Sequence, residues 1–393
     1  MGLRTQFVHL WVCDQTEKSN DTFEDYGLFT QVEQLNKTAL KAHGLDKNGH
    51  LYKVNSFDFH CYEDTIKLAD DPDYNQASFE GMLEIKGDSD HTKLIEMLDA
   101  LNDESQKIDE VLDTYFDAEN LVYWLAFQIL TGNCDTQNRN CYLYSPLNSN
   151  TWYILDWDND GMLRKLELSL AGFSDYASWE RGVSNYWGNV LFNRALRSKS
   201  FRSELDRAVK DLRSYMTEAR LAKMIRHYRE VTESLVFASP DIDNLPVTKD
   251  QYEQIAAAIP SEIEENYKSF RESYKKPMPF YIGVPQIDNG KLRINWDASY
   301  DFKARDIRYT VELARDYAIK DVFFKAEDVL LPEVTCDAPN AGQYFVRVRA
   351  TNSDGYIQDA FDYYVTDDGK HYGMKCFYVQ DSGKVVEDTY EEG

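Results

Sequence analysis

The chain has 393 residues, of which 43% are hydrophobic and 14% aromatic, so it can bury two or three cores and is not an intrinsically disordered protein. Its 68 acidic residues against 43 basic ones give a formal net charge of −25, which argues against nucleic acid as a partner because phosphates would be repelled. A basic protein or bound cations fit this charge better. The longest apolar run, residues 121–130, covers about half of the ~20 residues that a membrane-spanning helix needs, so no span is predicted.

Neither the N-terminus nor the cysteines carry a recognisable signal. No basic segment leads into an apolar one at the start of the sequence, so no signal peptide is predicted in this chain. The cysteines are scattered without a Cys-x-x-Cys pair, which indicates neither a disulfide framework nor a zinc site. They are Cys13, Cys61, Cys134, Cys141, Cys336 and Cys376.

The first elements along the chain have the composition of strands. Residues 5–14 and 26–35 are rich in β-branched and aromatic side chains and are separated by an acidic, turn-like stretch. We therefore expect two paired strands. Further along, residues 91–101 carry apolar side chains at intervals of three and four, which predicts a helix.

A central buried helix is predicted over residues 117–132. The segment is apolar almost all round, with Asp117 placed as its N-cap and Gly132 as its stop. A polar loop, NCDTQNRN, follows it, and then residues 140–145 and 150–156 form two short strand-like runs joined by a turn signal. We expect a hairpin there, and further helices from residue 187 to about 275.

The sequence pattern changes near residue 278. From there, short runs of alternating apolar and polar residues, separated by turns, predict a β-sandwich. Tyr309, Val311 and Leu313 should point to one side of a half-buried strand, and Thr310 and Glu312 to the other. A buried Trp296 and a strand at residues 344–350 resemble the fibronectin type III pattern. The predicted organisation is therefore a first domain at 1–277, a sandwich at 278–367 and an acidic tail at 368–393.

The stretch DWDNDGMLRKLE, residues 156–167, matches the calcium-loop pattern D-x-[DN]-x-[DN]-G-x5-E in full. An EF-hand loop must be entered from a helix, however, and this stretch is entered from a predicted strand. A metal site at the end of a strand is therefore favoured, and a calcium-binding protein is kept as an alternative.

The loop after the buried helix and the end of the hairpin supply groups suited to phosphoryl transfer. Asp135 and Asn140 lie in the loop, and Asp158 follows the second strand of the hairpin. This order, Asp-x4-Asn followed by a second Asp, is used by enzymes of the protein-kinase kind. One carboxylate orients and deprotonates the attacking hydroxyl, while an amide oxygen and a second carboxylate hold magnesium against the phosphates.

These residues carry a family resemblance. The segments DAENLVYWLAFQILTGNCDTQNRNCYLY and WYILDWDND resemble the CotH spore-coat kinase family, which pairs an Asp-x4-Asn loop with a Trp-Asp-x-Asp strand end. The upstream EDYGLFTQVEQLNKTAL and HLYK also resemble that family's segments. The resemblance covers about residues 5–275. It implies an α+β, atypical protein-kinase-like fold that binds ATP and Mg²⁺ and phosphorylates Ser or Thr of protein partners such as spore-coat proteins.

The resemblance also implies roles for single residues. Asp156 stands where the family tends to have proline and is interpreted as a hairpin or supporting group. The implied roles are Asp135 as catalytic base, Asn140 and Asp158 as metal ligands, Asp160 as a second carboxylate near the metal, Glu33 beside the adenine and Lys53 on phosphate. As alternatives to these roles, Glu33 could equally be a surface strand residue and Lys53 an exposed lysine.

One departure from the family keeps a second class of function open. Members normally carry an Arg-Gly-x-x-Ser-like loop and a lysine-bearing strand before the Tyr-Gly segment, and this sequence begins after that point, so the upper lobe is expected to be reduced or truncated. A catalytically inactive pseudokinase that acts as a binding or scaffold module is therefore the alternative to an active kinase. An extracellular or cell- or spore-surface setting and a basic, Ser/Thr-rich protein substrate are expected, while the oligomeric state is not predicted.

Overall fold

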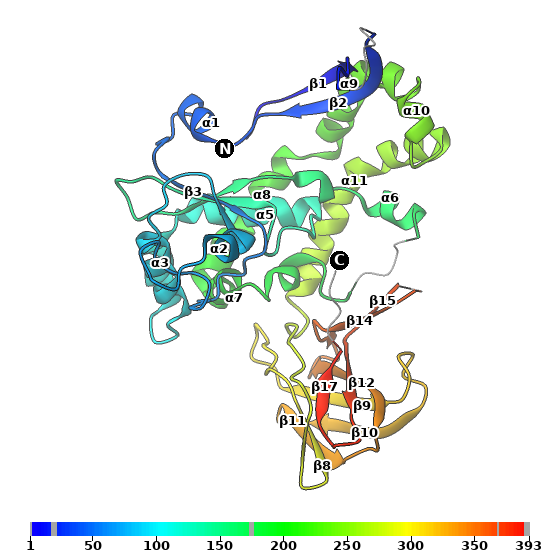
Figure 1. Ribbon diagram of the computed structural model, residues 1–393. Coiled ribbons are helices and arrows are strands. Elements are labelled where there is room, and N and C mark those ends of the chain that lie inside the picture. Colours follow the sequence, from blue (N-terminus) through cyan, green and yellow to red (C-terminus); the bar gives the residue numbers. More distant parts are fainter. Residues whose placement is uncertain (1, 17–21, 173–176, 368, 389–393) are drawn as a thin grey trace. The chain divides into compact units, whose positions relative to one another are not determined.

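The computed structural model describes residues 2–16, 22–172, 177–367 and 369–388 (Figure 1). The chain divides into two compact units, one made of Met1–Gly172 with Asn189–Asn266 and one of Phe173–Gly188 with Tyr267–Gly393. The first unit is mostly helical and the second is built from β-sheets, which confirms the expected mixture of α and β structure. The domain boundaries predicted from the sequence stay a prediction.

The first unit begins with a two-stranded antiparallel ribbon, drawn in dark blue in Figure 1. Strand β1 (Thr5–Val12) pairs with β2 (Glu24–Val32), which confirms the predicted pair of strands. The ribbon packs against helix α9 (Glu218–Val236), where the rings of Phe7 and Tyr228 meet edge to face with their centroids 6.0 Å apart.

The first unit also contains a four-stranded antiparallel sheet. Its order is β4-β3-β5-β6, with β3 at His50–Val54, β4 at Leu83–Ile85, β5 at Cys141–Ser145 and β6 at Tyr153–Asp156. Strands β5 and β6 are the predicted hairpin. Large aromatic side chains of this sheet are fully buried and anchor it, namely Tyr52, Tyr142 and Tyr144, and Trp152, directly before β6, is buried as well.

Helix α5 (Ala118–Thr131) is the predicted central helix, and it packs against β6 and against helix α8 (Lys199–Tyr215). Asp117 accepts a hydrogen bond from the backbone N–H of Asn120 at 2.8 Å, so it is the N-cap. Gly132 ends the helix with φ = 65°, a left-handed conformation that a glycine adopts without steric cost. Both predicted helix boundaries are confirmed.

The cap gives a prediction about stability. Replacing Asp117 by alanine removes the acceptor for a backbone N–H that has no partner inside the helix, and we expect a loss of about 1 kcal/mol in the free energy of unfolding. Urea unfolding followed by circular dichroism measures it. Asp117→Asn keeps an acceptor and should lose much less, so an equal loss in both variants would contradict the capping role.

The remaining helices complete the first unit, apart from the end of α11, which crosses into the second. In the range from 187 to about 275, five helices bear out the predicted helical region. Within the described residues, no helix combines the length and the apolar composition that crossing a membrane requires. The helices not yet named are α1 (Lys37–Ala42), α2 (Gln76–Met82), α3 (Thr92–Asn102), α4 (Ile108–Tyr115), α6 (Lys165–Leu170), α7 (Val190–Arg197), α10 (Asp241–Asn244) and α11 (Lys249–Ser273).

The second unit contains a three-stranded sheet, a larger sheet and a short ribbon. The three-stranded sheet has the order β11-β8-β7, and the larger one β10-β9-β12-β16-β17 with β13 also paired to β12. Strands β14 and β15 form the ribbon. The strands are β7 (Gln286–Asp288), β8 (Lys291–Asn295), β9 (Ile307–Ala314), β10 (Val322–Val329), β11 (Glu333–Asp337), β12 (Gly342–Asn352), β13 (Ile357–Asp359), β14 (Tyr363–Thr366), β15 (Gly369–Tyr372), β16 (Met374–Val379) and β17 (Val385–Glu387).

The core of this unit is built from side chains of the three-stranded sheet and of the larger sheet. Tyr309, Val311 and Leu313 lie in it together with Trp296, as the predicted alternation requires. Glu312 points to the other side of β9, where it accepts hydrogen bonds from the guanidinium of Arg347 at 2.6 and 3.0 Å.

Part of the stretch predicted to be an acidic tail belongs to the sheet. Residues 374–379 form β16, which pairs with β12 over six residues of each strand. Cys376, Phe377 and Val379 are buried there. The expected acidic tail is therefore wrong for residues 374–379, because a short apolar run among acidic residues was not recognised as a strand.

Candidate active site

The loop after α5 brings two of the predicted site residues into direct contact. Asn140 Nδ2 donates a hydrogen bond to Asp135 Oδ2 at 2.7 Å. On the other oxygen of the same carboxylate, Arg139 Nε donates to Asp135 Oδ1, also at 2.7 Å. Asn140 has φ = 58°, a left-handed conformation that is uncommon outside glycine and that turns the chain from the loop into β5.

The second part of the site is the turn that follows β6. Asp158 has φ = 54° and ψ = 59° and begins a short 3₁₀ helix, η1 (Asn159–Gly161). Asn159 Oδ1 accepts hydrogen bonds of 3.3 Å from Gln128 on α5 and from Asn133 in the loop, which ties the turn to the end of α5. Gly161 lies so close to the loop that a Cβ there would be 2.7 Å from Asn133 Oδ1, so a larger residue would displace the Asn133 side chain.

Three charged candidate residues act on the carboxyl group of Asp158. The surrounding protein removes part of the hydration of Asp158, and this desolvation is the main reason why the pKa of its carboxyl is raised. Asp160 and Asp135 raise that pKa further as like charges, and Lys53 opposes them as an opposite charge. The charges of Asp135, Asp160 and Lys53 therefore all act on Asp158, and Asn140 is linked to Asp135 through its hydrogen bond.

Lys53 lies on β3. It pairs across the sheet with Tyr142 of β5. Its Nζ lies 5.8 Å from the centroid of the Trp157 ring, next to Asp158 in the chain. The sheet thus carries a basic side chain to the carboxylates. Its role on phosphate stays a prediction.

The residues of the calcium-like pattern have other partners. Asp156, half-buried, accepts a hydrogen bond from Gln128 Nε2 at 2.9 Å, and burial raises the pKa of its carboxyl. Glu167, at the last position of the pattern, pairs with Arg164 at 2.6 Å. The stretch is entered from strand β6, as predicted, rather than from the helix of an EF-hand. Across the part of the chain that the structure describes, no three or more Asp, Glu, His or Cys side chains are grouped to hold a metal ion.

Glu33, predicted to border the adenine, directly follows β2. Arg4 Nε donates to its Oε1 at 3.0 Å, and His43 Nε2 lies 2.7 Å from its Oε2. These hydrogen bonds, that of Arg4 first, lower the pKa of Glu33 from 4.5 to about 2. A cavity of about 540 Å³ lies at the same place, lined by Arg4, Thr5, Gln6, Gln31, Val32, Glu33 and Gln34. The contact with adenine stays a prediction.

The lowered pKa of Glu33 predicts a pH dependence. Because its folded-state pKa is depressed, Glu33 stabilises the fold fully above its ordinary pKa of 4.5, and this contribution is lost as the pH falls towards about 2. Glu33→Gln should therefore be less stable than the wild type at pH 7, with a difference that shrinks by pH 3. Urea unfolding at both pH values checks this, and a difference that does not change with pH would contradict the ion pairing.

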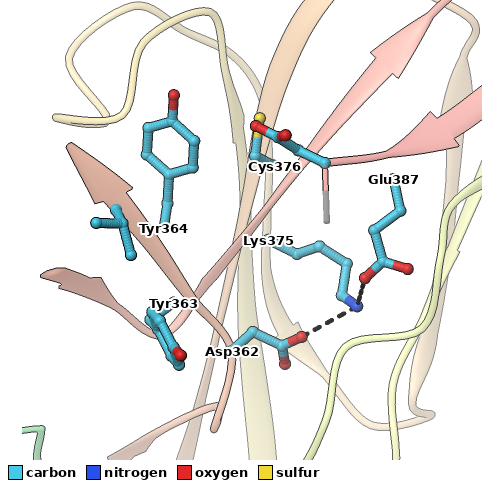
Figure 2. Close-up of a pocket in the computed structure, with 8 residues that line it drawn as sticks. Asp362, Tyr363, Tyr364, Lys375, Cys376 and Glu387 are labelled. Atoms are coloured by element: carbon cyan, nitrogen blue, oxygen red, sulfur yellow. Dashed lines mark hydrogen bonds and ion pairs between the residues drawn. The ribbon is translucent and has the colours of Figure 1, made fainter. Parts of the chain in front are cut away.

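A second cavity, of about 370 Å³, lies in the C-terminal unit and is shown in Figure 2. In it, the Lys375 ammonium lies between Asp362, at 3.1 Å, and Glu387. Neither of the two cavities is lined by Asp135, Asn140 or Asp158. The candidate site is instead an open cluster of charged side chains at the ends of α5 and β6.

The sequence reasoning did not identify three residues that shape this cluster. Gln128 and Asn133 fasten the turn after β6, and Asn133 Nδ2 donates to Gln128 Oε1 at 3.0 Å. Arg139 covers Asp135. The only available signal was position, since Arg139 stands directly before Asn140 in a loop of polar residues.

Comparison with known proteins identifies the family. The model of the CotH kinase protein family matches residues 1–270, and the chain belongs to this family. Comparison with curated proteins gave no match. Among solved structures, the twitchin kinase region from C. elegans is matched at 18% identity and a TM-score of 0.19, over 24% of this chain and 20% of that one, a likeness too weak to support an argument.

Proposed function

We propose that this chain is an active kinase that transfers the γ-phosphoryl group of ATP to a Ser or Thr hydroxyl of a protein partner, with Mg²⁺ as cofactor. One observation carries the proposal. The Asp135 carboxylate accepts a hydrogen bond from Asn140 at 2.7 Å and its charge acts on Asp158, which supports a shared site for the three residues that phosphoryl transfer needs. Membership of the CotH kinase protein family supports the same activity.

The donor set fits magnesium. Asn140 uses Nδ2 towards Asp135, so its amide oxygen is the end that remains for a cation, and Asp158 and Asp160 add carboxylate oxygens. Mg²⁺ prefers such oxygen ligands and takes only one or two carboxylates when phosphates supply the rest. The left-handed backbone of both Asn140 and Asp158 is a further support, since such conformations concentrate at functional sites. When bound, Mg²⁺ would neutralise charge on the phosphates.

Each side chain then has a role in the transfer. Asp135 accepts the proton of the substrate hydroxyl while that oxygen bonds to the γ-phosphorus. The bond from the γ-phosphorus to the bridging oxygen breaks, and its electron pair leaves with ADP. Lys53 would place positive charge beside the phosphates, and Asn140 holds Asp135 in position through its amide.

The finer fold assignments also belong to this proposal. We infer an atypical kinase-like arrangement for the first unit, and a fibronectin type III-like sandwich for the second. Two sheets of order β11-β8-β7 and β10-β9-β12-β16 around a core with Trp296 support the sandwich. So does Tyr344 at the start of β12, whose hydroxyl donates back to the Asn340 carbonyl at 2.9 Å, as in a tyrosine corner. Such a module supports an extracellular or cell- or spore-surface setting.

A pseudokinase remains the second candidate, because Arg139 is paired with the proposed base. Incubation with labelled ATP, Mg²⁺ and a basic, Ser-rich protein separates the possibilities. Mg²⁺-dependent label on the protein is the expected result. Thermal stabilisation by Mg·ATP without any transfer would instead indicate a pseudokinase, and stabilisation by Ca²⁺ alone a calcium-binding protein.

A further inference from the structure

Arg139 covers the carboxylate that is proposed to act as the base. Its Nε and Nη2 both lie 2.7 Å from Asp135 Oδ1, while Asn140 occupies Oδ2. A proton and a guanidinium compete for the same oxygen. In this arrangement Asp135 is therefore poorly placed to take a proton from a substrate hydroxyl.

The contact between Arg139 and Asp135 is one that can be exchanged at small cost. The two side chains are 53% and 42% exposed, and they are only four residues apart in one loop. Ion pairs exposed to this degree contribute about 0–1 kcal/mol, because water screens them. A better partner for the guanidinium would displace the carboxylate.

Phosphate is such a partner. The guanidinium presents a rigid fork of N–H donors that matches two phosphate oxygens, and such pairs are stronger than those with screened surface carboxylates. At the site, Arg139 pairs with Asp135, and the charges of Lys53, Asp135 and Asp160 act on Asp158. A nucleotide adds further negative charge, so its phosphates attract both basic side chains in addition to Mg²⁺.

We propose that Arg139 exchanges partners when ATP binds, leaving Asp135 and pairing with oxygens of the γ-phosphate. The inference rests on the kinase function proposed above. The exchange does two things at once. It places positive charge on the group that is transferred, as an arginine does in other phosphoryl-transfer enzymes, and it frees Asp135 Oδ1 to accept the hydroxyl proton.

The γ-phosphate provides the test, because ADP lacks it. Titration calorimetry with Mg·ADP and with the Mg²⁺ complex of the β,γ-imido analogue of ATP compares the wild type with Arg139→Gln and Arg139→Lys. We expect Arg139→Gln to bind the analogue about tenfold more weakly, the worth of one hydrogen-bonded contact to a charged group. Affinity for ADP should stay within roughly twofold, because only an exposed ion pair is lost. Arg139→Lys should keep part of the affinity as a point charge.

A matched control is Arg207→Gln, which removes an exposed arginine that pairs with Glu204 on α8. Its affinities for both nucleotides should equal those of the wild type. If Arg139→Gln leaves the ratio of the two affinities unchanged, Arg139 is only a surface ion pair and the inference is wrong. This inference and the kinase proposal can fail separately. A wild type that binds both nucleotides but transfers no phosphate refutes the kinase activity. The ratio of the two affinities then still shows whether Arg139 contacts the γ-phosphate. A wild type that binds neither nucleotide refutes both.

Discussion

Replacing Asp135 by asparagine should lower the rate of phosphoryl transfer by about 10³-fold, the usual contribution of a positioned general base. Asparagine has nearly the same shape, and its side-chain oxygen can still accept from Arg139, but it cannot take up the proton of the hydroxyl. Binding of Mg·ATP should change little, because Asp135 is not a proposed metal ligand. The initial rate of label transfer and the affinity for Mg·ATP are the two quantities to measure.

The control for this variant is Asp113→Asn, which changes an exposed aspartate on α4 by the same atoms. It should transfer phosphate at the wild-type rate. Circular dichroism melting shows that both variants are folded. If Asp135→Asn transfers phosphate within a few-fold of the wild type, another group is the base and the role of the loop after α5 is misassigned.

Asp158→Asn should have the second large effect, but of a different kind. The variant loses a negative ligand for Mg²⁺, so both Mg·ATP affinity and transfer should fall, the latter by roughly 10³-fold, since metal neutralisation of phosphate charge is worth several kcal/mol. High Mg²⁺ concentrations should restore part of the activity of Asp158→Asn and none of that of Asp135→Asn. Rates measured over a series of Mg²⁺ concentrations test this contrast.

Asp160→Asn provides a graded comparison for Asp158. Asp158 and Asp160 are both exposed, and Asp160 acts on Asp158 through its charge, so the loss of Asp160 should weaken the Mg²⁺ dependence less than the loss of the proposed central ligand does. Equal effects of the two variants would mean that no single carboxylate is the central ligand. A Mg²⁺ dependence unchanged in both would place the metal elsewhere.

The parts of the fold that could be predicted are those in which local chemistry decides. Asp117 and Gly132 were predicted as the limits of α5 because capping and left-handed termination depend on residues within one turn. The hairpin of β5 and β6 followed from a turn signal between apolar runs. Strand β16 was missed because its place in the sheet depends on pairing with β12, which lies about thirty residues earlier in the chain.

The residues of the candidate site could be proposed from the sequence, but the contacts that they make could not be predicted. Asp135, Asn140 and Asp158 were chosen because their order along the chain matches a known chemistry. The structure joins Asp135 and Asn140 by a hydrogen bond, and the roles of all three stay predictions. The pairing of Arg139 with Asp135 could not be predicted, because a loop of polar residues offers many such pairs of similar energy. The partners of Glu33 come from two other segments, and pattern alone does not specify them.

The central claim is that Asn140 and Asp158 hold a metal ion against the phosphates of a nucleotide beside Asp135. A crystal structure with Mn²⁺ in place of Mg²⁺ and the β,γ-imido analogue of ATP tests it most directly, because manganese is located by its anomalous scattering. We predict a metal peak about 2.0–2.3 Å from oxygens of both Asp158 and Asn140 and in contact with phosphate oxygens. A metal and nucleotide bound away from these residues would contradict the account.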